Sequence, residues 1–273
     1  MLANIIGKSW VPIIGEEFEM EYMRKLSNWL SYTRQSRTIY PESEDVFKAF
    51  RLCPYGQVKV VIVGQNPYHN GQADGLAFSF KDGKPAGSTK QALHVILDEI
   101  ESDCYNGFQV ARDYDLTYLA KQGVLLLNSV LTCFRGQPES HMKTAINSGI
   151  GWEMFIKKVL VSQIREENSK VFLLWGNKAQ EILDEAYIEY EKTFGFTSYR
   201  HLLLKAKHPA YDLYNRDQLG NIVSRYPDSF TGCKHFSQVN NFLAGKEEKK
   251  INWLPIREPE FNIDISEKEH FNS

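Results

Sequence analysis

A dense run of glycine, amide, histidine and aromatic residues, GQNPYHNGQADGLAFS, occupies positions 64–79. It follows directly on an apolar run at 58–63, so a buried strand is expected to lead straight into a polar loop. Ligands of parallel α/β sheets bind beyond the carboxyl ends of the strands. An active site is therefore expected in this loop.

Three further apolar, β-rich runs, at 124–127, 171–175 and 202–204, also end in polar segments. These segments read NSVLT, GNKAQ and KAKHPAYDL. If the four runs are neighbouring parallel strands, their ends bring several polar side chains toward one rim of the sheet. The side chains expected there are Asn66, Asn128, Asn177 and His208.

The spacing of the loop residues argues against several other chemistries. Gly64, Gly71 and Gly75 match neither GxGxxG nor GxxxxGK[ST], and Pro67 would interrupt a phosphate-binding loop. No GxSxG or HExxH motif occurs, so acyl transfer and zinc proteolysis have no sequence signature.

The segments between the apolar runs have helical spacing. One face of each expected helix carries Met23, Leu26, Trp29 and Leu30, then Leu93, Ile96, Leu97 and Ile100, then Trp152, Phe155, Ile156 and Val159. Ser88 or Thr89 is the expected N-cap of the second helix. Strands alternating with helices predict an α/β fold, with a central four-stranded parallel sheet flanked by helices on both faces. We expect a single domain over residues 1–257, followed by a charged and flexible tail at 258–273.

Composition narrows the class of protein. The chain has 273 residues, 42% hydrophobic and 24% charged, which is typical of a globular protein. Its formal net charge of −2 means that any DNA contact must come from local loops. The scattered cysteines and the absence of a long apolar segment predict reduced thiols, no metal site, no membrane association and a cytoplasmic location.

An ordered set of motifs resembles the uracil-DNA glycosylase family (family 1-like) from Trp10 to about Trp253. The set comprises TIYP, VKVVIVGQNPYH, GQADGLAFS, AKQGVLLLNSVLT, SH at 140–141, GWEMF, VFLLWGNKAQ, KHP at 207–209 and GCKHFS. The resemblance implies a monofunctional DNA glycosylase that needs no metal or other cofactor. Such an enzyme flips a uracil-like base out of single- or double-stranded DNA and hydrolyses its N-glycosidic bond, leaving an abasic site.

The resemblance also implies which residues hold the base. Phe78 would stack on the flipped uracil, and Tyr68 would crowd its C5 position and so reject thymine. Asn128 would hydrogen bond to the uracil edge, and the backbone of Gln65 would help to hold the base. An Asn128 amide turned over would instead match cytosine, so the specificity depends on what fixes its orientation.

For the chemical step, the resemblance assigns His208 as the donor to uracil O2 as the base departs. Ser88 and His141 match positions that contact phosphate. The family motif GQDPYH has aspartate where this chain has Asn66. Asn66 can orient the attacking water but cannot supply the negative charge that stabilises the cationic sugar.

A second departure follows His208. The family continues HPSPLS, with a leucine that wedges into the duplex, whereas this chain reads HPAYDLYNR and has a longer loop, by about a dozen residues. Leu213 is the nearest candidate for the wedge, and Tyr211 or Tyr214 could instead fill the space left by the flipped base.

These two departures leave alternatives open. The chain could be a glycosylase retargeted to a modified or mispaired pyrimidine, for example in phage DNA with a role in defence. Alternatively, it could be a DNA-binding protein that has kept the pocket and lost turnover. A monomer is expected in each case, and the sequence identifies no protein partner.

Overall fold

Four parallel strands form the central sheet, in the order β3-β2-β5-β6. The computed structural model describes residues 2–83, 91–106, 111–142, 151–196, 200–214 and 226–255. The strands are β2 (Val60–Gly64), β3 (Val124–Asn128), β5 (Val171–Trp175) and β6 (Leu202–Ala206). The four predicted runs are therefore confirmed as neighbouring parallel strands.

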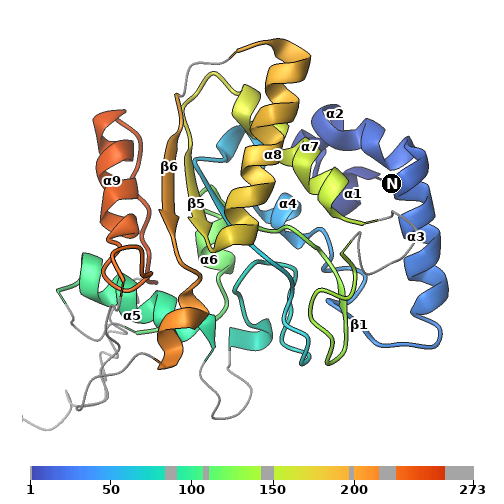
Figure 1. Cartoon of the computed structure of the whole chain (residues 1–273), viewed down its shortest axis with the longest axis horizontal. Helices are drawn as coiled ribbons and strands as arrows, with labels where there is room; N and C mark the ends of the chain where they lie inside the picture. The colour runs from blue at the N-terminus through green and yellow to red at the C-terminus, as the bar shows by residue number, and fades with distance from the viewer. Residues whose placement is uncertain are drawn as a thin grey trace, which may run out of the picture.

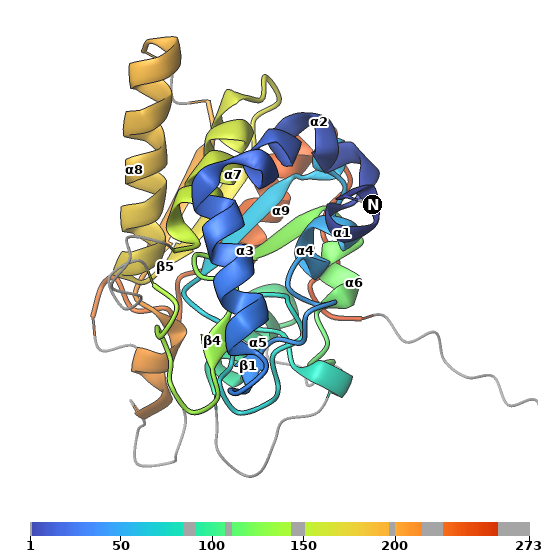
Figure 2. The same cartoon turned by 90° about the vertical axis from the view of Figure 1, so that its right-hand side faces the viewer.

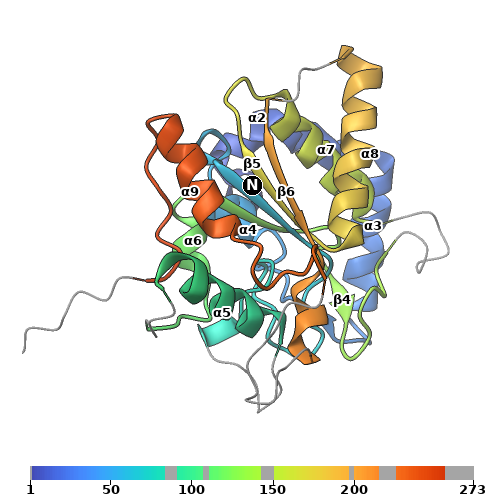
Figure 3. The ribbon, with the colours of Figure 1, turned by 60° about the vertical axis from the view of Figure 1, so that its left-hand side comes forward.

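Helices cover both faces of this sheet, as predicted. The described helices are α1 (Leu2–Ile6), α2 (Val11–Ile14), α3 (Glu21–Thr33), α4 (Lys48–Leu52), α5 (Ala92–Cys104), α6 (Thr117–Ala120), α7 (Glu153–Arg165), α8 (Asn177–Phe194) and α9 (His235–Gly245). Figures 1 and 3 show α5 and α9 on one side of the sheet and α7 and α8 on the other. In Figure 2, α3 runs across the near side of the molecule, next to the short N-terminal helices. Every side chain of β2, β3 and β5 is buried because both faces are covered.

The three predicted helices are present as α3, α5 and α7, but the start of α5 differs from the prediction. The helix begins at Ala92, and its N-cap is Gln91 rather than Ser88 or Thr89. The Gln91 backbone N–H donates to His94 Nδ1 at 3.0 Å, so a side chain inside the first turn satisfies the cap. Serine and threonine are commoner caps than glutamine, which is why the sequence pointed to the earlier residues.

A two-stranded antiparallel sheet, which the sequence did not predict, lies apart from the central one. It pairs β1 (Ile39–Tyr40) with β4 (Cys133–Phe134). The sheet joins the TIYP segment to the segment that follows β3. Strands of two residues are too short to show an alternating pattern, so the sequence carried no signal for them.

The end of the described chain docks on the body. Ile251, Trp253 and Leu254 are buried, and the Trp253 indole N–H donates to the Phe236 carbonyl at 3.1 Å. The predicted tail at 258–273 lies outside the described residues. No helix in the described part of the chain is long and apolar enough to cross a membrane.

Candidate active site

A pocket of about 460 Å³ opens at the carboxyl edge of the central sheet. It is lined by Gln65, Asn66, Pro67, Tyr68, His69, Asn70, Leu76, Phe78, Gln91, Ala92, Asn128, His208, Ala210 and Leu213. The lining residues come from the segments after β2 and β6, from the last residue of β3 and from the start of α5. The structure thus brings together seven of the residues predicted from the sequence, namely Gln65, Asn66, Tyr68, Phe78, Asn128, His208 and Leu213.

Phe78 provides an aromatic wall of the pocket and has an unusual backbone. Its φ is 66°, in the left-handed region that bulky residues rarely adopt. Two contacts brace this conformation: the Tyr68 hydroxyl donates to the Phe78 carbonyl at 3.3 Å, and the next residue, Ser79, donates to Asp74 at 2.8 Å. Asp74 is itself buried and paired with Lys48 at 2.9 Å. The ring position is therefore fixed by the surrounding loop.

Tyr68 lies beside this wall with its own ring fixed. It packs edge-on against Phe80, with the ring centroids 4.9 Å apart. Burial raises the pKa of the Tyr68 phenol, so the hydroxyl stays protonated and can keep its bond to the Phe78 carbonyl. A ring held in this way gives the pocket a rigid limit on the size of a ligand.

Asn128 ends β3 and pairs in register with Gly64 at the end of β2. The side chain is only 5% exposed but lines the pocket. A Cβ added at Gly64 would overlap the Asn128 side-chain oxygen and would lie 3.1 Å from the Ala77 Cβ. Glycine at position 64 therefore leaves the space that this amide occupies, and the amide edge remains available to a ligand.

His208 follows β6 and is held in one tautomer. The Ala210 backbone N–H donates to His208 Nδ1 at 3.1 Å, so Nδ1 acts as an acceptor and carries no proton. Burial lowers the pKa of the imidazole, which favours its neutral form. In the neutral form the proton is on Nε2, and His208 can donate from that atom.

Gly176, at the end of β5, supports the same ring from the neighbouring strand. Its φ is +92°, and a Cβ added there would lie 3.0 Å from the His208 Cβ. The imidazole and the Phe78 ring are in contact, with centroids 5.9 Å apart. A hydrogen-bond donor and a stacking surface are thus held next to each other.

Asn66 lies in the loop after β2 with its amide group oriented. The Asn66 Nδ2 donates to the Pro67 carbonyl at 2.9 Å. That bond leaves the amide oxygen as an acceptor, which is the group needed to hold a water molecule. Asp, Glu, Lys and Arg are all absent from the described lining of the pocket, so the site is formally uncharged.

These features together fit a planar, neutral, hydrogen-bonding ligand. Phe78 offers a face for stacking, Asn128 offers an amide edge, and His208 offers an N–H donor. Stacking and edge-on hydrogen bonds are the means by which proteins read a nucleobase that has left its duplex. The geometry therefore favours a base-binding pocket with a place for one water molecule.

The family model for the uracil-DNA glycosylase superfamily matches residues 50–244, more than half of the chain. The chain belongs to this superfamily. Curated relatives named uracil-DNA glycosylase agree with the match. The protein of Alkaliphilus metalliredigens is 37% identical over 251 residues, which cover 92% of this chain and 96% of the relative. That of Geobacillus kaustophilus is 38% identical over 255 residues, covering 91% and 95%.

Solved structures of the superfamily share the fold. The crystal structure of mimivirus uracil-DNA glycosylase has a TM-score of 0.72 and covers 92% of this chain and 88% of that chain. Because the sequence identity is 22%, this likeness concerns the fold alone.

Two predicted residues that the structure describes, Asn177 and Tyr211, do not line the pocket of this superfamily member. Asn177 is exposed at the start of α8 and does not line the pocket, because Gly176 occupies the position that faces His208. Tyr211 is 69% exposed on the short helix η5 (Pro209–Tyr214). Ser88 lies outside the described residues, as does the side chain of Tyr214.

His141 contradicts the prediction that it contacts phosphate. It is 0% exposed, and its ring packs edge-on against Trp29 and Phe134. The Thr132 hydroxyl bonds to its Nδ1 at 2.8 Å. A side chain without exposed surface cannot reach a phosphate, so His141 belongs to the core beneath the segment that follows β3.

Buried His141 should make stability depend on pH. Burial, reinforced by the nearby cations Arg34 and Arg37, lowers its pKa to about 3. As the pH falls below about 6.5, this histidine takes up a proton in the unfolded chain but stays neutral in the folded chain. The free energy of unfolding therefore decreases on acidification below about pH 6.5. Between pH 7 and 5 this one histidine should cost the wild type about 2 kcal/mol of unfolding free energy.

Urea denaturation of the wild type and of His141→Gln at both pH values measures this effect. The variant should lose less stability on acidification, by about the same 2 kcal/mol. An identical loss in the two proteins would show that His141 is protonated in the folded state. Base excision at pH 7 serves as the check that the variant folds normally.

Several lining residues were missed by the sequence reasoning. His69 and Asn70 belong to the motif itself and could have been identified from it. Gln91 had no such signal, because it reaches the pocket only through the fold. Its side chain and that of Asn70 both donate to the Gln72 side-chain oxygen at 2.8 Å, forming a polar bridge beside the pocket.

Gly64→Ala tests whether the pocket needs the close approach of Asn128. The added Cβ would displace the Asn128 amide and press on Ala77 and the Phe78 ring. We expect kcat/KM for base excision to fall by about tenfold or more, because small displacements of positioning groups have large effects on rate. Single-turnover kinetics measures the loss, and near-wild-type activity would show that the amide can move without consequence.

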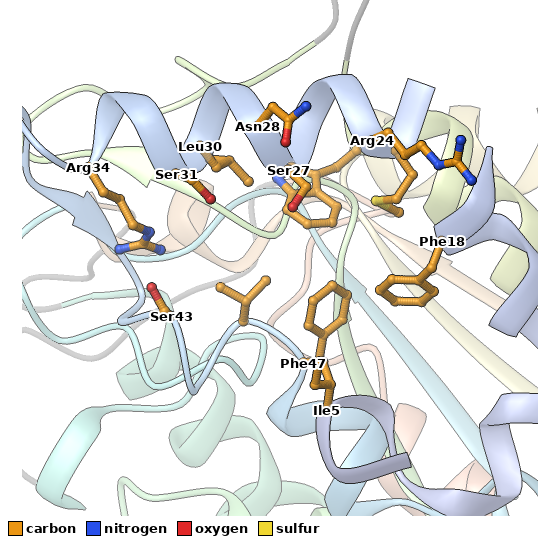
Figure 4. Close-up of a pocket in the computed structure, with 13 residues that line it drawn as sticks. Ile5, Phe18, Arg24, Ser27, Asn28, Leu30, Ser31, Arg34, Ser43 and Phe47 are labelled. Atoms are coloured by element: carbon orange, nitrogen blue, oxygen red, sulfur yellow. The ribbon is translucent and has the colours of Figure 1, made fainter. Parts of the chain in front are cut away.

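A second pocket, of about 450 Å³, lies beneath α3, away from the strand ends (Figure 4). Its walls include Ile5, Phe18 and Phe47, and its rim includes Arg24 and Arg34. Both rim cations already have partners: Arg24 pairs with Glu19 at 2.6 Å, and Arg34 donates to the carbonyls of Ile39 and Pro41. The described lining of this pocket contains no histidine, so it lacks a donor like the one that the predicted chemistry assigns to the departing base.

Proposed function

We propose that the protein is a DNA glycosylase that excises uracil from DNA by hydrolysing the N-glycosidic bond. The observation that carries the proposal is the neutral, Nε2-protonated His208 in the same pocket as Asn128 and Phe78. The names of the curated relatives support the same activity. No cofactor is needed, because every step has a candidate side chain in the pocket.

In this mechanism the flipped uracil stacks on Phe78 and bonds through its edge to the Asn128 amide. As the glycosidic bond breaks, electrons move into the base, and negative charge develops on uracil O2. The His208 Nε2–H donates to that oxygen and stabilises the charge. A water molecule held by the Asn66 amide oxygen then bonds to the cationic sugar carbon and loses one proton to solvent, while the released uracil anion takes up a proton from solvent, which completes the hydrolysis.

Asn66 makes this enzyme slower than one with a carboxylate at the same position. The sugar becomes cationic as the bond breaks, and an uncharged amide stabilises a cation only through its dipole. The pocket lining contains no carboxylate among the described residues that could replace the missing charge. We therefore propose a retained reaction with a reduced rate.

A glycosylase with a changed target is the second candidate, favoured by the same uncharged Asn66 and by the altered sequence after His208. The Tyr68 ring would clash with a bulky group at C5 of the base, because contacts with Phe78 and Phe80 hold the ring in place. A modified or mispaired pyrimidine without such bulk remains compatible with the pocket. A DNA-binding protein without turnover is the third candidate.

One assay distinguishes these candidates. Single- and double-stranded oligonucleotides carrying uracil, and then modified cytosines, are incubated with the protein, and abasic sites are cleaved with alkali. Strand cleavage of uracil DNA supports the proposal, whereas cleavage of modified DNA alone supports the changed target. Binding without cleavage of any substrate rejects both enzyme functions.

We propose that η5 contacts the DNA next to the flipped base and that Ser88 contacts a phosphate group of the DNA. Leu213 lines the pocket and Tyr211 points to solvent, so one helix offers both a wedge and an exposed ring. Asp212, between them, is 1% exposed and accepts from the Thr231 backbone N–H at 2.8 Å. That bond anchors η5 to the segment before α9.

Leu213→Ala should reduce excision from duplex DNA by about tenfold and from single strands much less. Extruding a base from a duplex costs a few kcal/mol, and a wedging side chain offsets part of that cost, whereas a single strand needs no such help. The ratio of single-turnover rates on the two substrates is the measurement. Tyr211→Ala, made in parallel, shows whether the exposed ring shares the role, and an equal loss on both substrates would assign Leu213 to the pocket alone.

We further propose a monomer that acts in the cytoplasm and consists of one domain, residues 1–257, with 258–273 as a tail. The four cysteines are unpaired, which is typical of a reducing compartment. Among the described residues, no group of three or more His, Cys, Asp or Glu side chains could hold a metal ion.

A further inference from the structure

A third pocket, of about 470 Å³, lies at the opposite edge of the central sheet, where the strands begin. Its lining is Gly56, Gln57, Val58, Lys59, Lys121, Gln122, Asn168, Ser169, Lys170, Glu248, Lys249 and Lys250. Lys59 directly precedes β2 and Lys170 directly precedes β5, so the sheet itself positions both residues. Residues 248–250, which follow α9, form another wall.

The lining of this amino-edge pocket is strongly basic. Five lysines face a single carboxylate, that of Glu248, in a chain whose formal net charge is −2. Like charges held this close repel one another, so their concentration in a concave site favours an anionic ligand. The base-binding pocket at the other edge contains no charged residue in its described lining.

Lys170 is the strongest indication that this pocket binds an anion, because its ammonium group is buried and has few hydrogen-bond partners. The residue is 3% exposed, and its Nζ donates to the Val58 carbonyl at 2.7 Å. An ammonium group has three N–H donors, and Val58 is the one acceptor for them among the described residues. Burial lowers the pKa of Lys170, and Glu166 and Glu248 oppose that shift only in part. A buried charge left in this state is costly unless an anion completes its coordination.

The walls of the pocket are tied together around Lys170. Lys59 Nζ donates to the Lys249 carbonyl at 3.2 Å, which links the start of β2 to the 248–250 wall. The Lys59 carbonyl accepts from the Val171 N–H at 3.0 Å, which links it to β5. Gln122 accepts from the Asn252 N–H at 2.9 Å and so fixes the chain just beyond the wall. The lysines are therefore carried by a braced framework.

We propose that this amino-edge pocket binds a small molecule carrying a chain of two or more phosphate groups. Lysine ammonium groups bind phosphate as point charges, and several of them together match a ligand of high negative charge. The pocket volume is in the range of sites for small molecules. A nucleic-acid backbone is a poorer fit, because it presents its phosphates along an extended track and cannot bring two of them to the buried Lys170.

Isothermal titration calorimetry of the full chain with sodium tripolyphosphate, at low ionic strength, tests the proposal. The wild type should bind one molecule, with an affinity that falls as salt is added. Lys170→Met and the double variant Lys249→Gln/Lys250→Gln should each weaken binding by about tenfold or more. Excision of uracil should be unchanged in both variants, since these residues lie at the far edge of the sheet, and this confirms that they fold.

The matched control is Lys178→Gln/Lys192→Gln, which removes the same charge from exposed lysines of α8 that do not line the pocket. It should bind tripolyphosphate as the wild type does. A nucleoside triphosphate distinguishes the source of the phosphate chain: equal affinity means that the chain alone is recognised, and higher affinity means that the nucleoside contributes. The proposal is overturned if the wild type does not bind tripolyphosphate, or if the control loses as much affinity as the pocket variants. It is also overturned if an oligonucleotide without terminal phosphates binds at these lysines while tripolyphosphate does not.

Discussion

Replacing Asn66 with aspartate is expected to raise the single-turnover rate of uracil excision by up to about a thousandfold. The carboxylate keeps an acceptor oxygen for the water and adds a negative charge opposite the cationic sugar. A unit charge at about 4 Å, with an effective dielectric constant of about 20, contributes up to about 4 kcal/mol. The bond from Asn66 Nδ2 to the Pro67 carbonyl is lost in the variant, which sets the gain below that ceiling.

Asn66→Ala is the matched control for this gain. Alanine removes the acceptor for water without adding charge, so its rate should fall below that of the wild type. Both variants are compared on single-stranded DNA, where no duplex has to open, so that the chemical step is measured. If aspartate brings no increase on uracil while the wild type cleaves a modified base, the target of the pocket has changed and the proposed function is wrong.

Replacing His208 with leucine is expected to lower the excision rate by about a hundred- to a thousandfold. The change removes the Nε2–H donor to the departing base, and the loss of one such donor typically has this effect. The effect should be on kcat more than on KM, because negative charge on the base develops only in the transition state. Single-turnover and steady-state kinetics on uracil DNA separate the two.

The pH profile of the wild type adds a second measurement for the same residue. Burial lowers the pKa of His208 below its usual 6.5, so the active neutral form prevails from pH 8 down to about 6.5. The rate should therefore be flat over that range and fall only at lower pH, when the imidazole gains a proton. Because Nδ1 accepts from Ala210, that proton also breaks the bond that orients the ring. A rate that rises on acidification between pH 8 and 6.5 would contradict a neutral donor.

Much of this site could be predicted because strand ends in a parallel sheet converge. Four apolar runs were enough to identify the strands, and the rule for ligand position then placed Asn66, Asn128 and His208 in one pocket. The rule fails for Asn177, because the chain turns at Gly176 and α8 begins immediately, which points the asparagine into solvent. The sequence shows where a strand ends, but the direction of the next side chains depends on the turn that follows the strand.

Burial and long-range contacts were beyond the reach of the sequence. In the sequence, nothing distinguishes a buried histidine such as His141 from a histidine in a binding site. Its burial comes from Trp29 on α3 and Phe134 on β4, which are distant in the chain. The amino-edge lysines are equally scattered along the chain, from Lys59 to Lys250, and only the fold gathers them. Neither arrangement leaves a periodic or spaced pattern in the sequence.

The left-handed backbone at Phe78 implies a conflict between stability and activity at this position. A bulky residue with a φ of 66° costs about 1–3 kcal/mol that the native state must carry at all times. Glycine would relieve that cost and would make the protein harder to unfold, but it would remove the ring on which the base stacks in the proposed mechanism. In the proposed mechanism, stability and excision therefore favour different residues at position 78.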